Sequence, residues 1–209
     1  MLPRSFYTRA DVVQIARDLL GRQIFTRMDG IITSGLICET EAYAGITDKA
    51  SHAYGGRRTE RTSIMYSRGG TSYIYLCYGI HSLFNIVTNR EEIPHAVLIR
   101  GIIPAEGTAT MLQRAGKVKI GKEFGIGPGK VSKILGIHYS DSGLDLVTKP
   151  GNDTAPAIWI EDSAIKINPA MIKSGPRIGV DYAGEDARLP YRFWCEIPSP
   201  EKIKVLLPV

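Results

Sequence analysis

Apolar and polar residues alternate along several segments of this chain, a period of two that is typical of β-strands with one buried face. Asp29-Gly30 separates the first two segments and predicts a tight hairpin turn. Gly79 marks a second turn, between an aromatic-rich segment and its returning strand. The predicted strands cover 23–28, 30–38, 72–78, 83–88, 95–103, 157–160, 164–167 and 192–196. We expect the segments 157–160 and 164–167 to pair as a hairpin.

Three segments have the spacing and the end residues of helices. Residues 8–21 carry an apolar stripe, with Thr8 as the expected N-cap. A short helix is predicted over 108–114, and another after Gly127, where proline is the first helical residue. We therefore expect one α+β domain over residues 1–209, with a curved, mostly antiparallel sheet, a protruding β-hairpin and flanking helices.

Composition narrows the classes of protein. The formal net charge of +5 permits a polyanionic partner, although no run of like charges fixes one. The three cysteines are widely spaced and form no CxxC pair, which favours a reducing compartment over a disulfide framework or structural zinc. The N-terminus lacks the apolar core of a signal peptide, and no segment is long and apolar enough to span a membrane. We expect a cytoplasmic protein, associated with the nucleoid if it is bacterial, with no membrane partner.

One strand carries unusual polar residues. Continued beyond Cys38, the period of two places Glu39, Glu41 and Tyr43 on one face. Carboxylates are costly to bury, so this face is expected to border a cleft, with His52 nine residues further on. Two other interpretations stay open from these residues alone. One is a solvated edge strand with a loop histidine. The other, less favoured because the histidines form no ligand pattern, is a metal site.

Two further features suit a nucleic acid. Tyr78 lies beside the Gly79 turn, and a ring at a hairpin tip can wedge between stacked bases, although strand tyrosines commonly pack in a core. Gly127-Pro128-Gly129-Lys130 opens a helix whose free N–H groups and positive dipole end suit one phosphate. The segment lacks the P-loop spacing, so an ordinary capped helix with a surface lysine is the alternative.

Motifs over most of the chain resemble the alkyladenine (3-methyladenine) DNA glycosylase family. They recur in the family's order: Glu39-Thr40-Glu41-Ala42-Tyr43, Ala50-Ser51-His52, the segment 70–75, Tyr78-Gly79-Ile80-His81, Asn85, and the segments 96–100, 127–130 and 177–180. The loops at 61–62 and 68–70 depart from the usual pattern. The resemblance implies an enzyme that flips a damaged base out of duplex DNA and hydrolyses its N-glycosidic bond with no metal and no cofactor.

By matching position, the resemblance also implies residue roles. Glu41 would activate the attacking water, and Arg100 would help to hold it, with the Val180 carbonyl as a further candidate contact. The base pocket would consist of Tyr43, His52, Tyr75 and Asn85. Intercalation and backbone contacts would fall to Tyr78, Ile80, His81 and Lys130.

The expected partner is double-stranded DNA that carries a damaged purine, bound by a monomer. The expected substrates are 3-methyladenine, 7-methylguanine, hypoxanthine and etheno-adenine. No lysine occurs in the pocket motifs, so we expect no Schiff base and no strand cleavage. Two alternatives come from other classes of protein: a catalytically silent DNA-damage-binding protein, and a metal-assisted small-molecule hydrolase that uses Glu39 and Glu41.

Overall fold

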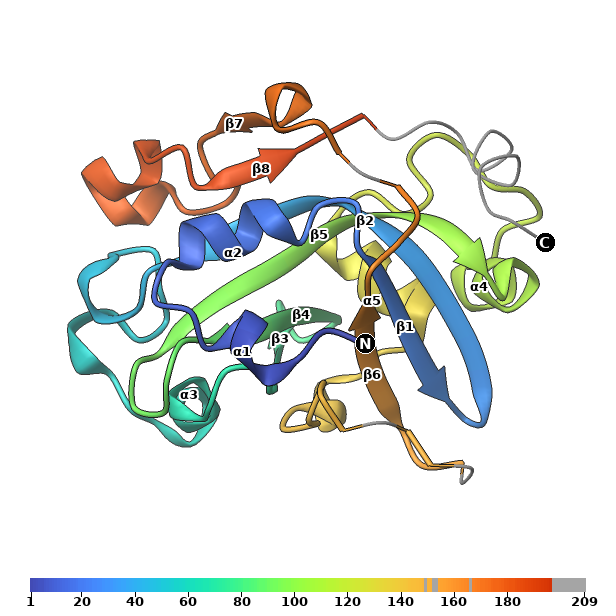
Figure 1. Ribbon diagram of the computed structural model, residues 1–209, viewed down its shortest axis with the longest axis horizontal. Coiled ribbons are helices and arrows are strands. Elements are labelled where there is room, and N and C mark those ends of the chain that lie inside the picture. Colours follow the sequence, from blue (N-terminus) through green and yellow to red (C-terminus); the bar gives the residue numbers. More distant parts are fainter. Residues whose placement is uncertain (149, 152–153, 166, 197–209) are drawn as a thin grey trace.

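The computed structural model describes residues 1–148, 150–151, 154–165 and 167–196, which fold around one open antiparallel sheet (Figure 1). The strands of this described part are β1 (Gln23–Met28), β2 (Ile31–Tyr43), β3 (Ser72–Cys77), β4 (His81–Thr88), β5 (His95–Glu106), β6 (Ala157–Glu161), β7 (Lys173–Gly175) and β8 (Arg192–Trp194). Six of them lie in the order β3-β4-β5-β2-β1-β6, and β8 pairs with both β2 and β7. The α+β class expected from the sequence is confirmed.

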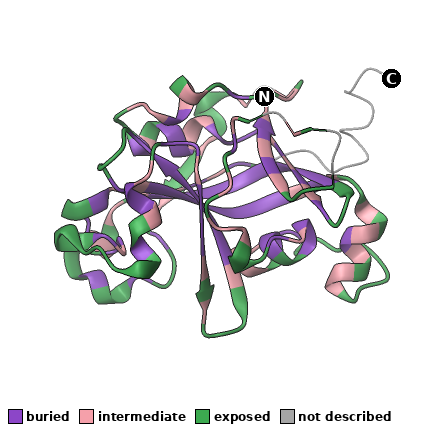
Figure 2. Cartoon of the chain, turned by 90° about the horizontal axis from the view of Figure 1, so that it is seen from below, coloured by how far each residue is buried: buried purple, intermediate pink, exposed green. Residues whose placement is uncertain are grey.

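Helices cover both faces of the sheet. The α-helices are α1 (Arg4–Tyr7), α2 (Val12–Asp18), α3 (Glu60–Ser63), α4 (Thr108–Ala115) and α5 (Pro128–Leu135). The 3₁₀ helices are η1 (Gly45–Thr47), η2 (Tyr54–Gly56), η3 (Ile64–Tyr66), η4 (Tyr139–Asp141), η5 (Pro169–Met171) and η6 (Asp181–Arg188). Helix α2 packs on β2 and β5, and α5 packs on β4 and β5 from the opposite face (Figures 1 and 2). Within the described residues, none of the helices has the length and apolarity that crossing a membrane requires.

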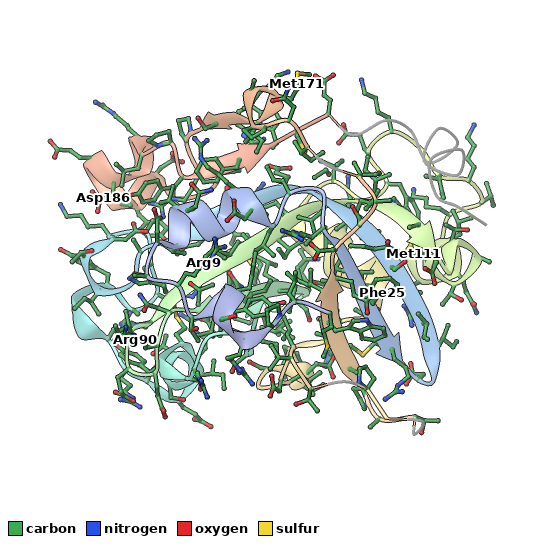
Figure 3. All side chains as sticks on the ribbon, in the orientation of Figure 1. Arg9, Phe25, Arg90, Met111, Met171 and Asp186 are labelled. Carbon is green, nitrogen blue, oxygen red and sulfur yellow. The ribbon has the colours of Figure 1, made fainter. Side chains whose placement is uncertain are left out.

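The main core lies between these helices and the sheet. Ile15 of α2, Ile24 of β1 and Ile99 of β5 are fully buried in it. Met111 of α4 is also fully buried there, whereas Arg90 lies exposed at the edge of the molecule (Figure 3). This continuous core holds β2 and β5 rigidly side by side, and both strands carry residues of the candidate site.

Two predictions about elements were wrong. The helix expected over 8–21 begins only after Asp11, whose side chain accepts a hydrogen bond from the Gln14 N–H, while Thr8 instead ends α1. The segment 157–160 pairs with β1 and not with 164–167, which forms no strand in its described residues. The Ser163 hydroxyl donates to the Gly21 carbonyl, and this contact directs the chain onto the core in place of a hairpin.

The protruding hairpin expected from the sequence is confirmed as β3–β4, which projects from the body with an exposed tip (Figure 2). Its returning strand begins at His81, two residues earlier than predicted. Tyr78 and Gly79 both have positive φ, 51° and 73°, and the Ile80 N–H donates to the Cys77 carbonyl at 3.2 Å. The Tyr78 side chain at this turn is 92% exposed. The chain therefore presents an aromatic ring to solvent at its most prominent point.

Candidate active site

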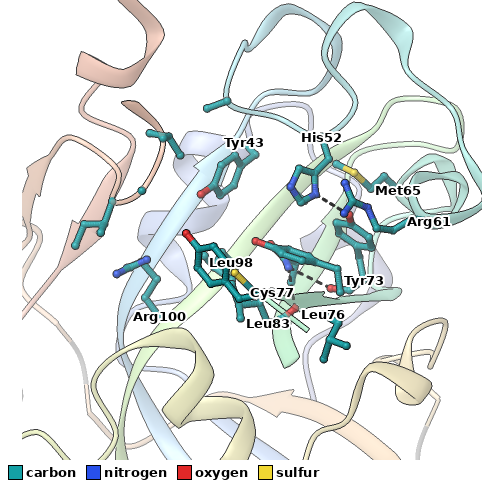
Figure 4. Close-up of a pocket in the computed structure, with 18 of the residues that line it drawn as sticks. Tyr43, His52, Arg61, Met65, Tyr73, Leu76, Cys77, Leu83, Leu98 and Arg100 are labelled. Carbon is teal, nitrogen blue, oxygen red and sulfur yellow. Dashed lines mark hydrogen bonds between the residues drawn. The ribbon is translucent and has the colours of Figure 1, made fainter. Parts of the chain in front are cut away.

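A cavity of about 390 Å³ opens between the end of β2, the β3–β4 hairpin, β5 and the segment 178–182 (Figure 4). Its wall is mostly aromatic and aliphatic, with Leu98 from β5 and Met65 from η3 among the apolar residues. Seven of the eleven residues given roles from the sequence line it: Tyr43, His52, Tyr75, Tyr78, Asn85, Arg100 and Val180. Motifs that lie far apart in the chain thus converge on one cavity.

The aromatic side of the cavity is built by His52, Tyr73 and Tyr75. The His52 and Tyr75 rings meet edge to face with centroids 4.6 Å apart. His52 Nδ1 lies 2.7 Å from the Tyr73 hydroxyl, which fixes the orientation of the imidazole. Burial, aided by the nearby charges of Arg61 and Arg57, lowers the pKa of His52 to about 4. The imidazole is therefore neutral near pH 7.

Glu41 lies directly behind the cavity wall. Its side chain is 0% exposed. The Ile178 N–H donates to Oε1 at 2.8 Å, and the Tyr43 hydroxyl donates to Oε2 at 2.8 Å. Arg100 Nε lies 3.4 Å from Oε1. All three of these neighbours line the cavity, so Glu41 is separated from it by a single layer of its own donors.

Burial raises the pKa of the Glu41 carboxyl, because desolvation penalises the anion more than its neighbours stabilise it. Arg100, the Ile178 N–H and the Tyr43 hydroxyl act against this rise, and the charge of Glu39 adds to it. A carboxyl with a raised pKa needs a higher pH to ionise than an exposed glutamate does, but its anion is the stronger general base.

Glu39 lies on the same side of β2, as the alternation predicted. Its Oε1 accepts from Arg100 Nε at 3.1 Å and from Arg192 Nε at 2.6 Å. Unlike Arg100, Glu39 is not among the residues that line the cavity.

A second buried acid–arginine pair supports the site. The two terminal nitrogens of Arg177 bind the two carboxylate oxygens of Asp48, at 2.5 and 2.8 Å. Asp48 also accepts from two backbone N–H groups of its own turn. The Arg177 guanidinium lies 4.8 Å from the centre of the Tyr43 ring. This pair fixes the loop after β2 against the segment that carries Ile178, and thereby fixes two of the donors to Glu41.

Asn85 reaches the cavity from β4. Its Nδ2 donates to the backbone carbonyls of Tyr73 and Leu83, at 3.2 and 3.1 Å. Among the described residues nothing bonds to its Oδ1, and Asn85 is part of the cavity lining. Two bonds to the rigid hairpin hold this amide in place.

The other residues assigned to DNA lie outside the cavity. Ile80 and His81 are exposed beside Tyr78 on the hairpin. His81 packs close to Gly129 at the start of α5, which brings the hairpin stem next to that helix. Lys130 is exposed, and its Nζ donates to the Glu123 carbonyl. The hairpin and the start of α5 therefore form one continuous surface beside the cavity.

In the described part of the chain, no three histidine, cysteine, aspartate or glutamate side chains are grouped so that they could hold a metal ion. Asp48, the acid in the loop after β2, is fully engaged with Arg177 and backbone N–H groups. His52 instead lines the aromatic cavity, and Glu41 lies behind its wall.

Comparison with known proteins identifies the family. The family model described as "Methylpurine-DNA glycosylase (MPG)" matches residues 5–198. A Chlamydia felis protein is 45% identical over 204 residues, which cover 97% of this chain and all of that protein. A Bacillus cereus protein is 40% identical over 199 residues, 93% of this chain and 95% of that protein. Both are named "Putative 3-methyladenine DNA glycosylase".

The chain belongs to the methylpurine-DNA glycosylase family. The resemblance inferred from the motifs is confirmed, and the match extends over nearly the whole chain. The protein is therefore a DNA N-glycosylase for alkylated bases, and DNA is its binding partner.

The sequence analysis missed several residues of this glycosylase's site. Tyr73, which orients His52, shares a strand face with Tyr75, and that alternation could have indicated it. The donor at Ile178 is a backbone N–H and leaves no signal in the side-chain pattern. Asp48 and Arg177 pair across 129 residues, a separation that no local pattern resolves.

Proposed function

We propose that this glycosylase extrudes a damaged purine from double-stranded DNA into the cavity and hydrolyses its N-glycosidic bond with a water activated by Glu41. The observation that carries the proposal is the position of Glu41, a buried carboxylate one layer behind an aromatic cavity whose lining residues donate to it. The proposed substrates are 3-methyladenine, 7-methylguanine, hypoxanthine and etheno-adenine.

The base pocket is proposed to place the purine between Tyr43 on one side and His52 with Tyr75 on the other. Aromatic faces attract a cationic alkylated base by about 0.5–2 kcal/mol. A protonated imidazole would repel that cation. Because the pKa of His52 is lowered to about 4, its ring stays neutral at the pH of a cell and can stack on the base without repulsion.

Asn85 is proposed to close the floor of the pocket. Its amide is tied to the carbonyls of Tyr73 and Leu83, so it cannot swing aside without breaking two hydrogen bonds. A purine with an exocyclic amino group at that edge would collide with it. This arrangement supports discrimination against normal guanine. 7-Methylguanine carries the same amino group, and its excision is proposed to depend on its cationic ring, which weakens the N-glycosidic bond.

Bond cleavage is proposed to pass through an oxocarbenium-like sugar cation. Glu41 as an anion would stabilise that cation and take a proton from the attacking water. Arg100 lines the cavity, and its terminal amino groups would hold the water, with the carbonyl of Val180, another lining residue, as a further contact. Since Glu41 is 0% exposed, a small movement of the Tyr43 ring has to admit the water.

Extrusion of the nucleotide is proposed to depend on Tyr78. Extrusion costs a few kcal/mol, and a side chain that fills the gap offsets part of this. A tyrosine with φ of 51° carries roughly 1–2 kcal/mol of backbone strain, which a turn glycine or asparagine would largely avoid. Strained residues are concentrated at functional sites, which supports a wedge role for this ring.

The reaction is proposed to stop at the abasic site. Among the described residues of the cavity lining, none is a lysine that could form a Schiff base with the sugar. The residues of the proposed site, from Tyr43 to Val180, all come from one chain, and we propose that the enzyme acts as a monomer.

The experiment is single-turnover excision on a labelled duplex that carries one damaged purine, with EDTA present. Free base and an abasic but unnicked strand are the expected products. Tight binding without excision of any of the four lesions would contradict the proposed substrates. A strand nicked without further treatment would contradict the monofunctional reaction.

A further inference from the structure

Four charged side chains alternate in sign on one side of β2, β5 and β8. Glu41 contacts Arg100, Arg100 contacts Glu39, and Glu39 contacts Arg192. The first three are nearly inaccessible to solvent, with side-chain exposures of 0%, 10% and 8%, and Arg192 is partly exposed. Two negative and two positive charges balance, so the row is neutral when all four residues are ionised.

The backbone at Arg100 is fixed independently of its side chain. The β2–β5 ladder pairs Glu39 with Gly101 and Thr40 with Ile99, so Arg100 is the extra residue of a β-bulge. The Gly127 N–H donates to its carbonyl at 2.8 Å. A Cβ atom on Gly101 would lie 2.9 Å from the Glu39 Cβ, so glycine is needed for Glu39 to approach this closely. The bulge aims Arg100 between the two glutamates, and its side-chain contacts then decide where the guanidinium settles.

The contacts of Arg100 involve a single nitrogen. Nε lies 3.1 Å from Glu39 Oε1 and 3.4 Å from Glu41 Oε1. Among the described residues, nothing accepts a hydrogen bond from the two terminal amino groups of Arg100, which lines the cavity. A free guanidinium beside one carboxylate would normally form two parallel N–H···O bonds. Here Nε donates to Glu39, and among the described residues no two-bond pair between Arg100 and Glu41 is present.

We propose that Glu39 is a positioning residue that holds Arg100 by Nε, keeps its terminal amino groups directed at the cavity, and prevents it from closing on Glu41 as a two-bond ion pair. The inference rests on the proposed role of Glu41 as the base. Without Glu39, Arg100 would turn toward Glu41 and bind both of its carboxylate oxygens. These oxygens and the terminal amino groups of Arg100 would then no longer be available to the water. Arg192, which is partly exposed, offsets the negative charge of Glu39 and so limits how strongly Glu39 attracts Arg100.

The proposal predicts opposite pH effects for two neighbouring substitutions. The titratable or charged groups around Glu41 are Glu39 and Tyr43 on β2, Tyr75 on β3, Arg100 on β5, Arg177 before η6, Tyr182 in η6 and Arg192 on β8. Glu39→Gln removes a negative charge and lets Arg100 approach, and both changes lower the pKa of Glu41. Arg192→Gln removes a positive charge and raises it. The acidic limb of the rate profile should therefore move to lower pH in the first variant and to higher pH in the second.

The test is the single-turnover excision rate against pH at saturating enzyme, with DNA affinity measured separately. Glu39→Gln should lower the plateau rate by roughly 10- to 100-fold, the scale expected for a misplaced site group, with DNA affinity nearly unchanged. Glu39→Asp, which keeps the charge, should recover part of the loss. Thr40→Val is the matched control, because it removes a buried hydrogen bond to Ala16 of α2 from the same strand. It should lower thermal stability and leave the pH profile in place.

Each outcome decides a different point. An unchanged rate and profile in Glu39→Gln, with Glu41→Gln inactive, would overturn the positioning role and leave the proposed function intact. A second outcome is that Glu39→Gln loses rate without a shift of its pH profile, and that an equally destabilised Thr40→Val loses the same rate. That pair of results would overturn the positioning role and show that Glu39 is only structural. An active Glu41→Gln would instead overturn the proposed function. If Glu39→Gln does not fold, the upward shift in Arg192→Gln carries the test, and its absence overturns the proposal.

Discussion

The molecule contains two buried acid–arginine pairs close to the end of β2, and they differ in how the arginine is used. Arg177 binds both oxygens of Asp48 with both terminal nitrogens, and the two side chains are 0% and 2% exposed. Arg100 approaches Glu41 with Nε alone, at 3.4 Å, and shares that nitrogen with Glu39. Both pairs are shielded from water, so burial does not distinguish them.

The hydrogen bonds of the terminal arginine nitrogens do distinguish them. The terminal nitrogens of Arg177 are also taken by the carbonyls of Ala42 and Asp186, so this pair is closed and holds two chain segments together. Among the described residues, nothing accepts a hydrogen bond from the terminal nitrogens of Arg100, a residue that lines the cavity. A closed pair serves the fold, and an open pair keeps its charge available for a reaction.

The sharpest test of this contrast is Glu41→Gln. The substitution keeps the shape and the hydrogen bonds from Ile178 and Tyr43 within reach but removes the base. We expect the excision rate to fall by roughly 10²- to 10⁴-fold, the usual contribution of a general base. Single-turnover kinetics measure this loss, and fluorescence anisotropy with damaged duplex should show nearly unchanged affinity. Activity close to that of the unmodified enzyme would remove Glu41 from the mechanism.

Asp48→Asn should have its largest effect on stability. It leaves Arg177 with an uncompensated buried charge, which costs about 3–5 kcal/mol of the free energy of unfolding. Denaturant titration measures this cost. Asp18→Asn is the control, because its pair with Arg9 is partly exposed and should change stability by about 1 kcal/mol or less. Equal effects of the two substitutions would show that the closed pair is not what holds these segments.

Tyr43→Phe should produce the smallest effect. It keeps the ring for stacking and removes the hydroxyl that donates to Glu41 Oε2. That hydrogen bond stabilises the anion, so its loss raises the pKa of Glu41 further. The glutamate must be ionised to act as the base, and the acidic limb of the excision profile should therefore move to higher pH. A shift to lower pH would indicate that the hydroxyl does not donate to the carboxylate during the reaction.

Local patterns in the sequence were sufficient for much of the fold. The period of two identified β1 to β5, Asp29-Gly30 identified the first turn, and Gly127 with Pro128 marked the start of α5. The pairing of β6 with β1 was missed, because a partner strand more than a hundred residues away leaves no trace in either segment.

The parts of the site that depend on side-chain type and spacing could be predicted from the sequence. The parts that depend on backbone geometry could not. The alternation placed Glu41 and Tyr43 together, and the resemblance added His52 and Tyr75 from distant motifs. The bulge that aims Arg100 has no local signature beyond Gly101, and a backbone donor such as Ile178 has none. The full burial of Glu41 is also a property of the assembled fold, which sequence alternation cannot separate from partial exposure.

The hairpin turn at Tyr78 has a consequence for protein engineering. Asp29-Gly30 and Tyr78-Gly79 adopt nearly the same backbone, with φ of 55° and 72° in the first and 51° and 73° in the second. Aspartate and asparagine suit this turn and tyrosine does not. Tyr78→Asn should therefore stabilise the protein by roughly 1 kcal/mol in thermal unfolding. It should also weaken binding of damaged duplex by roughly tenfold or more, alike for all lesions, because a stacking ring is lost. A variant library selected for thermal stability alone would therefore enrich this substitution and lose binding of damaged DNA.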